Sequence, residues 1–411
     1  MKNIIGAGAR PQDSCGLHGK QVCDQYVVTL EIPVLKHFLF HILSCERRTN
    51  DSESEMGGIL ATRQSSRRVW FGLLAFLALF GFLVASRSSE AILKESSHLT
   101  SDDPVTNRTL GFSKIFAIGL PERTDKRDAF ALTSALTGFH VEFMDGVRGE
   151  SIPDQAVPFG VDRKALMETN LGSWRGHMNA IRRIVEEDLE SALIIEDDMD
   201  WDVRLKTQLK EVAKGARHFT SPDRPSSSPY GDSWDVLWLG HCGEVFPEQL
   251  PENEGKPEHA KYTILNDQTL PPPGKLTGLV DFANHPAFTR WVHVSGGPIC
   301  TFAYALSQSG ARKVLFDLSI DHSGGAFDNA LAAFCRDGAS GNLNGLRAKC
   351  LSVTPPVFFH HRAKGRLSSD SDIQGPTNTD VREKGTTENI MWSARNNLRN
   401  MMLGLKMESQ F

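Results

Sequence analysis

The stretch Ser191 to Asp200, SALIIEDDMD, constrains the fold of this chain most. Ala192 to Ile195 predict a short buried strand, and Glu196, Asp197 and Asp198 follow it without a turn residue. Carboxylates crowded at a strand end repel one another, so they are expected to hold a compensating cation, most often a hard divalent metal. An acidic triplet is common by chance, but one directly after four apolar residues is rare. The pattern therefore favours a metal or phosphate-metal site over a solvated turn.

The second informative feature is an apolar run near the N-terminus. Val69 to Ala85 holds 17 residues without a charge, and a helix of that length is about 26 Å long, enough for a thin bilayer. We therefore predict one transmembrane signal anchor over residues 67–87, in preference to a cleaved signal peptide or a core helix. Three basic residues before it, Arg63, Arg67 and Arg68, predict a cytosolic N-terminus. The rest of the chain would then face the lumen of the Golgi or the ER.

This topology divides the chain into four segments. Residues 1–66 are expected to be cytosolic, and either disordered or a mispredicted start with Met56 as the true initiator. Residues 88–111 are rich in Ser, Thr and acids, which is typical of a stem linker. They also contain a glycosylation sequon that begins at Asn107. Residues 112–405 form the predicted lumenal domain.

Composition limits the classes of partner. The net charge of -5 and the pI near 6.3 argue against nucleic acid. Four of the seven cysteines fall on the predicted lumenal side, an even number that allows three pairings. We predict the pairs Cys242 with Cys300 and Cys335 with Cys350, and buried free thiols are the alternative. The sequence leaves the oligomeric state open.

Strands and helices alternate before the acidic triplet. Lys114 to Leu120 and His140 to Met144 predict strands, and a helix that contains Ser173 leads into the strand before Glu196. Such alternation predicts parallel crossovers in an α/β sheet, in which ligands bind outside the carboxyl ends of the strands. The basic residues there suit a diphosphate, and a solvated helix N-terminus is the alternative. The polar residues that follow the first two strands are Arg123, Lys126, Arg127 and Asp145.

Later segments supply further candidates. His177 lies on the apolar face of its helix, where a hydrogen-bonded core histidine is more frequent than a catalyst. Asp328 opens a helix, either as an ordinary first-turn acid or as a general base beside the crevice. His360 and His361 end a strand, and neutral imidazole suits a metal shell that carboxylates began. Apolar spacing from Ile390 to Leu405 predicts an amphipathic helix.

Several stretches together resemble glycosyltransferase family 25, which includes bacterial lipopolysaccharide galactosyltransferases and animal collagen galactosyltransferases. GLPERTDKRDAF is similar to the first-strand signature of that family, and NLGSWRGHMNAIRRIVEEDLESALIIEDDMDWD is similar to its core block. WDVLWLG, ICTFAYALSQSGARKVL and the region from FDNALAAFC to SVTPPVF match in order. The resemblance covers about Lys114 to His361, and the cysteine pattern looks like the fungal subgroup. The family helix commonly carries Cys and Ser before its histidine, whereas Trp174 to Gly176 precede His177 here, which leaves the role of that histidine open.

The resemblance implies a GT-A-like, Rossmann-related fold with a mixed sheet flanked by helices. It also implies inverting transfer of a hexose, expected to be galactose, from a UDP-sugar to a glycan or glycoprotein acceptor with a divalent ion such as Mn²⁺. A lumenal glycoside hydrolase and a non-catalytic Golgi binding or scaffold protein are the alternatives. The expected roles are metal ligation by Glu196, Asp197, Asp198 and His361, nucleotide-sugar binding by Arg123, Arg127 and Asp145, and general base catalysis by Asp328.

Overall fold

The computed structural model describes residues 103–158, 161–220, 226–321, 325–340, 346–373 and 380–411. The predicted cytosolic segment 1–66, the predicted span 67–87 and residues 88–102 of the predicted stem lie outside these ranges. Within them, no helix combines the length and the apolar character needed to cross a membrane. The end of the predicted stem belongs to the folded unit, because Val105 and Leu110 are buried in its core.

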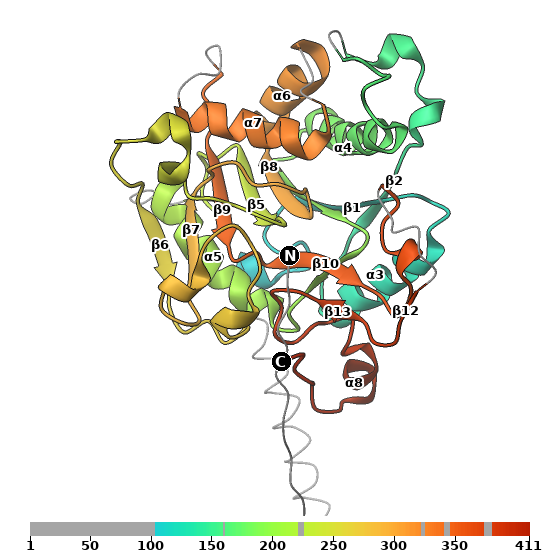
Figure 1. Ribbon diagram of the computed structural model, residues 1–411, viewed down its shortest axis with the longest axis vertical. Helices are drawn as coiled ribbons and strands as arrows, with labels where there is room; N and C mark the ends of the chain where they lie inside the picture. Colours follow the sequence, from blue (N-terminus) through green and yellow to red (C-terminus); the bar gives the residue numbers. More distant parts are fainter. Residues whose placement is uncertain (1–102, 159–160, 221–225, 322–324, 341–345, 374–379) are drawn as a thin grey trace, which may run out of the picture. The chain divides into compact units, whose positions relative to one another are not determined.

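A large mixed sheet forms the centre of the fold (Figure 1). β1 pairs in parallel with β2 and β3, and β5 pairs in parallel with β9, whereas the other neighbouring strands are antiparallel. The predicted mixed sheet and its first parallel crossovers are therefore confirmed. The strand order is β2 (Glu142–Asp145), β1 (Lys114–Gly119), β3 (Ser191–Glu196), β8 (Ala303–Ser307), β5 (Val236–Gly240), β9 (Cys350–Thr354), β7 (Arg290–Val294) and β6 (Lys261–Ile264).

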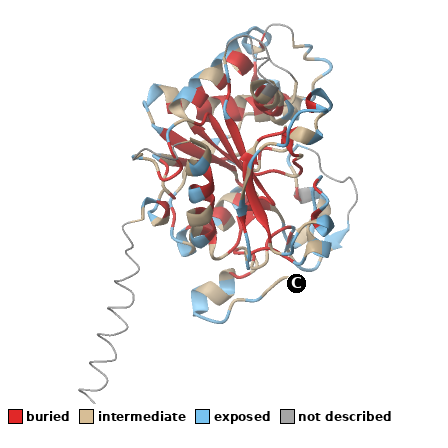
Figure 2. Cartoon of the chain, turned by 90° about the vertical axis from the view of Figure 1, so that its left-hand side faces the viewer, coloured by how far each residue is buried: buried red, intermediate tan, exposed pale blue. Residues whose placement is uncertain are grey.

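Helices cover both faces of the sheet, as Figure 1 shows. Successive side chains of a strand point to opposite faces, so Ile115 and Ala117 of β1 join one core cluster while Phe116 and Ile118 join the other. Figure 2 shows the resulting buried layer along the strands. The first cluster packs against α3 (Thr124–Leu136) and α5 (Leu205–Thr220), and the second against α4 (Glu168–Glu186), α6 (Gln308–Leu315) and α7 (Phe327–Ser340).

Two small sheets lie beside the large one. The last predicted strand is split at Pro355 and Pro356 into β9 and β10. The predicted helix over Ile390 to Leu405 is wrong in extent: only α8 (Leu398–Leu403) is helical, while Ile390 and Ala394 are buried outside a helix. The small sheets contain β13 (Thr386–Thr387), β10 (Phe358–Arg362) and β4 (Met199–Trp201), and β11 (Gly365–Arg366) with β12 (Val381–Arg382).

The register of the parallel strands brings their carboxyl ends to one edge. Ile118 pairs with Glu196, and Gly119 pairs with Asp145. The polar residues that follow β1, β2 and β3 therefore start from neighbouring positions, as the alternation in the sequence predicts.

Candidate functional site

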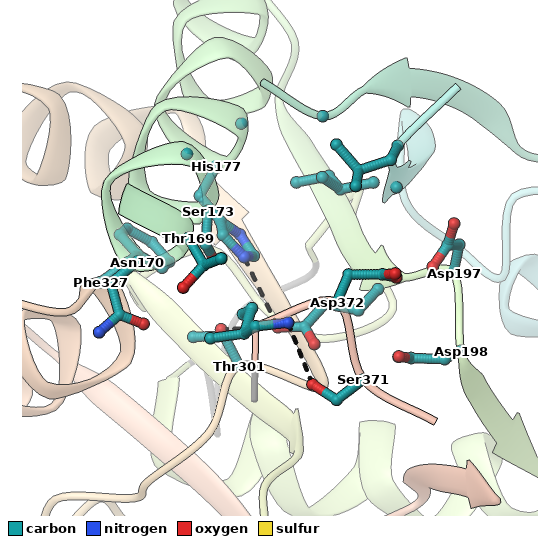
Figure 3. A pocket seen from close by; sticks show the side chains of 18 of the residues that line it. Thr169, Asn170, Ser173, His177, Asp197, Asp198, Thr301, Phe327, Ser371 and Asp372 are labelled. Atoms are coloured by element: carbon teal, nitrogen blue, oxygen red, sulfur yellow. Dashed lines mark hydrogen bonds and ion pairs between the residues drawn. The ribbon is translucent and has the colours of Figure 1, made fainter. Parts of the chain in front are cut away.

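A pocket of about 500 Å³ opens at this edge of the sheet (Figure 3). Its walls come from the end of β1, the loop after β2, the first half of α4, the acidic turn after β3 and the loop before β8. The start of α7, strand β10 and residues 371–373 complete it. In Figure 3 the α4 residues Asn170, Ser173 and His177 lie on one side of the pocket, and Asp197 and Asp198 lie on the other.

Asp197 and Asp198 define the acidic side of the pocket, and Asp197 is buried at the base of that side. Its amide donates to the Ile118 carbonyl at 2.9 Å, and its carboxylate packs so closely on Gly119 that a Cβ there would lie 1.7 Å from Asp197 Oδ2. Only glycine fits at position 119 without displacing this carboxylate. Burial, together with the charge of Asp198, raises the pKa of Asp197 well above its ordinary range. Asp197 Oδ2 is buried and has no hydrogen-bond partner within the residues that the structure describes.

Lys126 and His360 lie beside Asp198. Lys126 Nζ is 2.9 Å from Asp198 Oδ2, and His360 Nε2 is 3.6 Å from the same oxygen. Burial by itself would raise the pKa of Asp198, but the charges of His360 and Lys126 outweigh it and lower this pKa. Asp198 Oδ1 is buried, and none of the described residues forms a hydrogen bond with it. The charges around Asp198 thus favour its ionised form.

The segment 371–373 brings a third carboxylate to this side. Asp372 Oδ2 is 2.6 Å from Lys126 Nζ, and Asp372 also forms an ion pair with Arg123. Lys126 is only 8% exposed, so its ammonium is enclosed between Asp198 and Asp372. Asp370 anchors this segment through a bidentate pair with Arg382, at 2.9 and 2.8 Å.

The three residues predicted to contact a nucleotide sugar lie beside the pocket, whereas Lys126 and Arg148 line it. Arg127 ties the first two strands together, because its Nη2 donates to the Gly119 carbonyl at 2.9 Å and to Asp145 at 2.6 Å. Arg123 is the N-cap residue of α3 and forms ion pairs with Asp125 and Asp372. A direct contact of these side chains with a nucleotide stays a prediction.

Glu196 points away from the other two acids of the triplet. Its Oε1 accepts a hydrogen bond from Thr301 Oγ1 at 2.9 Å and lies 3.6 Å from His177 Nε2. His177 is buried, with Nδ1 3.0 Å from the Tyr304 hydroxyl and its ring stacked on Phe327. The apolar helix face therefore buries this histidine, as the sequence indicated, and yet His177 lies at the wall of the pocket.

The two histidines of β10 occupy opposite sides of the strand. His360 lines the pocket, and its buried Nε2 forms no hydrogen bond with any described residue. His361 lies on the other side, where its Nδ1 is 2.8 Å from Thr387 Oγ1 and 3.6 Å from Asp200 Oδ2. The histidine beside the acidic turn is thus His360, and metal ligation by His361 stays a prediction that its position does not favour.

Asp328 lines the pocket from the start of α7. Its Oδ2 accepts from the Cys300 amide at 3.3 Å, which links α7 to the loop that carries Thr301. The predicted disulfides are confirmed: Cys242 pairs with Cys300, and Cys335 pairs with Cys350. The first of these bonds fixes the same loop from its other side.

The segment 387–397 supports the acidic turn from behind. Asp200 is fully buried, and its oxygens accept from Thr387 Oγ1 at 2.6 Å, from the Ser393 hydroxyl and from the Arg395 amide at 3.0 Å. The Arg395 guanidinium donates to the Asp197 carbonyl at 2.6 Å. This partly buried cation also favours negative charge on the turn.

The residues of the acidic side suit a divalent ion in their chemistry. Asp197 Oδ2, Asp198 Oδ1 and His360 Nε2 are all buried without hydrogen-bond partners among the described residues, and carboxylate oxygen and imidazole nitrogen are ligands that Mn²⁺ accepts. As the described side chains stand, no group of three or more His, Cys, Asp or Glu residues is arranged to hold a metal. Lys126 instead supplies the positive charge next to Asp198.

Two pocket residues could not be found by sequence reasoning. Asp372 belongs to a polar stretch without periodicity, about 250 residues after Arg123, and nothing in that stretch indicates that it returns to the first helix. Thr301 lies in an apolar segment that predicts a strand, whereas β8 begins only at Ala303.

Comparison with known proteins places these features in context. Procollagen galactosyltransferase 2 of Mus musculus is 25% identical over 234 residues, and an inactive glycosyltransferase 25 family member 3 of Homo sapiens is 23% identical over 234 residues. Procollagen galactosyltransferase 1 of Danio rerio is 26% identical over 148 residues. No protein-family model matches the chain. This weak homology supports a glycosyltransferase of the family 25 kind.

The matches have limited extent. The two 234-residue matches cover 54% of this chain but only 30% and 32% of the relatives, and the Danio rerio match covers 33% of this chain and 23% of that relative. The chain therefore matches about a third or less of each relative's length. One of these relatives is named as inactive, so the similarity alone does not decide whether this chain is active.

Proposed function

We propose that this protein is a metal-dependent, inverting glycosyltransferase that moves a hexose from a UDP-sugar to a glycan or glycoprotein acceptor. One observation carries the proposal. A single pocket combines two buried carboxylate oxygens, on Asp197 and Asp198, that have no hydrogen-bond partner in the described part of the chain, with the enclosed ammonium of Lys126. Hard oxygen ligands beside a fixed cation suit a divalent ion bound to a diphosphate. Galactose is the proposed hexose because two of the relatives are named galactosyltransferases.

The acidic side would hold the leaving group. Asp197, Asp198 and His360 are the residues that would bind a divalent ion such as Mn²⁺, and the ion would neutralise charge on the departing diphosphate. Lys126 and Arg123 would bind phosphate oxygens, for which both cationic groups have donors. Binding of phosphate in this way requires that Asp372 release the two cations.

The acceptor side needs a base. In an inverting displacement, the acceptor oxygen bonds to the anomeric carbon while the bond to the diphosphate oxygen breaks, and the hydroxyl proton passes to a carboxylate. Asp328 is the proposed base, because it lines the pocket at the start of α7 and the Cys300 amide orients its carboxylate.

We place the protein in the Golgi or ER membrane, with a single span at residues 67–87 and the pocket in the lumen. The two disulfides support this compartment, because such bonds persist in oxidising environments and are rare in the cytosol. Fractionation of cells that produce the full chain, with protease protection of the folded unit, tests this location.

To test the activity, the full-length protein is incubated with a panel of nucleotide sugars, with and without Mn²⁺. The release of nucleoside diphosphate from each donor is measured. We expect UDP release from UDP-galactose that requires the metal. A non-catalytic scaffold is the second candidate, favoured by the inactive relative. It predicts no release of nucleoside diphosphate with any donor and any acceptor.

A further inference from the structure

We propose that Glu196 binds hydroxyl groups of the transferred hexose, and that the acidic triplet is divided between a sugar side and a diphosphate side of the pocket. This inference rests on the proposed function and deepens it. The inference assigns Glu196 a role other than metal ligation, although Glu196 directly precedes Asp197 and Asp198 in the sequence.

The division follows from the geometry of β3. Alternate residues of a strand face opposite sides of the sheet, and Ile194 belongs to the core cluster of α4, whereas Ile195 belongs to the cluster of α3 and α5. Glu196 continues the side of Ile194, toward His177 of α4. Asp197 continues the opposite side and packs on Gly119. Adjacent acids are therefore sent to different walls of one pocket.

Glu196 is held in one orientation by a hydroxyl group and lies beside a fixed imidazole ring. Thr301 Oγ1 donates to Oε1 at 2.9 Å, and the His177 ring beside that oxygen is fixed by Tyr304 at 3.0 Å and by Phe327 stacked at 4.4 Å. Tyr304 and Thr301 are both buried, so neither contact is open to competition from bulk water. A carboxylate fixed in this way loses little conformational freedom when a ligand binds.

The environment of Glu196 suits a neutral polar ligand. In the described part of the chain, no lysine or arginine forms an ion pair with Glu196, in contrast to Asp198 and Asp372, which share Lys126. The Glu196 side chain is 25% exposed, and Glu196 lines the pocket. Hydrogen bonds from hydroxyls to a carboxylate are charge-assisted and strong.

The neighbouring wall has the same neutral character. Thr169, Asn170 and Ser173 line the pocket from the first turns of α4, on the side of His177 in Figure 3. Hydroxyl and amide groups both donate and accept hydrogen bonds, as sugar hydroxyls do. The charged diphosphate and the neutral hexose of one donor would thus each meet a wall of matching chemistry.

The substitution Glu196→Gln tests this division in the full-length protein, because it removes the charge and keeps the size. Three quantities are measured: the Kd of UDP with Mn²⁺, the Kd of UDP-galactose with Mn²⁺, and the Kd of Mn²⁺ itself by electron paramagnetic resonance. We expect the Kd of UDP-galactose to rise about tenfold, as for the loss of one hydrogen bond to a charged group. The Kd of UDP and that of Mn²⁺ should stay at the wild-type values.

Asp198→Asn is the matched control, because it removes the same charge two residues away and should weaken binding of Mn²⁺ and UDP together. Thermal unfolding of both variants shows whether each is folded. If Glu196→Gln weakens Mn²⁺ and UDP as Asp198→Asn does, Glu196 is a metal ligand and the inference is overturned. If all three Kd values of Glu196→Gln equal those of the wild-type protein, the inference is overturned as well. Failure of the wild-type protein to bind UDP or UDP-galactose would instead remove the proposed function, and the inference with it.

Discussion

The ion pairs of Asp372 lead to a prediction about nucleotide affinity. Asp372 neutralises Lys126 and Arg123, the two cations proposed to bind the diphosphate. A nucleoside diphosphate must exchange with this carboxylate before it can pair with either cation. We therefore expect Asp372→Asn to bind UDP more tightly than the wild-type protein.

The size of the effect follows from the exposure of the partners. The Asp372 side chain is 30% exposed, whereas those of Lys126 and Arg123 are 9% and 17% exposed. Solvent screens a pair with such a partner, so each ion pair is worth about 0.5–1 kcal/mol. Loss of both pairs corresponds to about 1–2 kcal/mol, or a Kd of UDP that is roughly 5- to 30-fold lower.

Isothermal titration of the full-length protein with UDP measures this change, once with EDTA and once with Mn²⁺. Glu150→Gln is the matched control, because Glu150 is an exposed carboxylate of the same pocket and does not pair with Lys126 or Arg123. It should change the Kd of UDP by less than about twofold, since distant exposed charges are screened by salt. A Kd that is unchanged or higher in Asp372→Asn would refute the reasoning, and a higher Kd only with Mn²⁺ would make Asp372 a metal ligand.

Three further predictions follow from individual side chains. Asp198→Asn should abolish Mn²⁺-dependent transfer while the protein still folds; unchanged turnover would remove the metal assignment. For Asp328→Asn we expect UDP binding to survive and transfer to fail, and transfer near the wild-type rate would place the base elsewhere. Burial raises the pKa of Glu244 from its ordinary 4.5 to about 8. Because the folded state resists ionisation, this residue lowers stability progressively as the pH rises from about 4.5 to about 8, by at most about 5 kcal/mol at 1.4 kcal/mol per pKa unit. Glu244→Gln should remove this pH dependence, which chemical denaturation at several pH values measures; identical profiles would contradict the pKa shift.

The large sheet was predictable where the sequence alternates regularly. Apolar runs before Arg123, Asp145 and Glu196 predicted three parallel strands, and parallel register brings their ends together. The existence of a polar site at this edge could therefore be predicted. The direction of each side chain there could not be predicted, because the consecutive acids Glu196 and Asp197 lie on opposite sides of the sheet.

The structure of the later part of the chain was harder to predict from the sequence, for physical reasons. The choice between His360 and His361 depends on which face of β10 meets the acidic turn. This depends on pairing with β13 and with β4, which is far away in the sequence. The apolar spacing at Ile390 and Ala394 matches a helix, but backbone and side-chain bonds to Asp200 and its neighbours override that preference. Long-range contacts of this kind leave no local signal.

The support of the acidic turn by residues 387–397 has a consequence for the time at which the turn takes its final form. Asp200 and Arg395 are joined by a bond that spans 195 residues of sequence, so the turn lacks this support until the ribosome has made that later segment. Translation at about 5–20 residues per second puts roughly 10 to 40 seconds between the two. During that interval Asp197 and Asp198 belong to a nascent chain whose sheet is incomplete. The acidic turn therefore takes its final form only after residues 387–397 have been made.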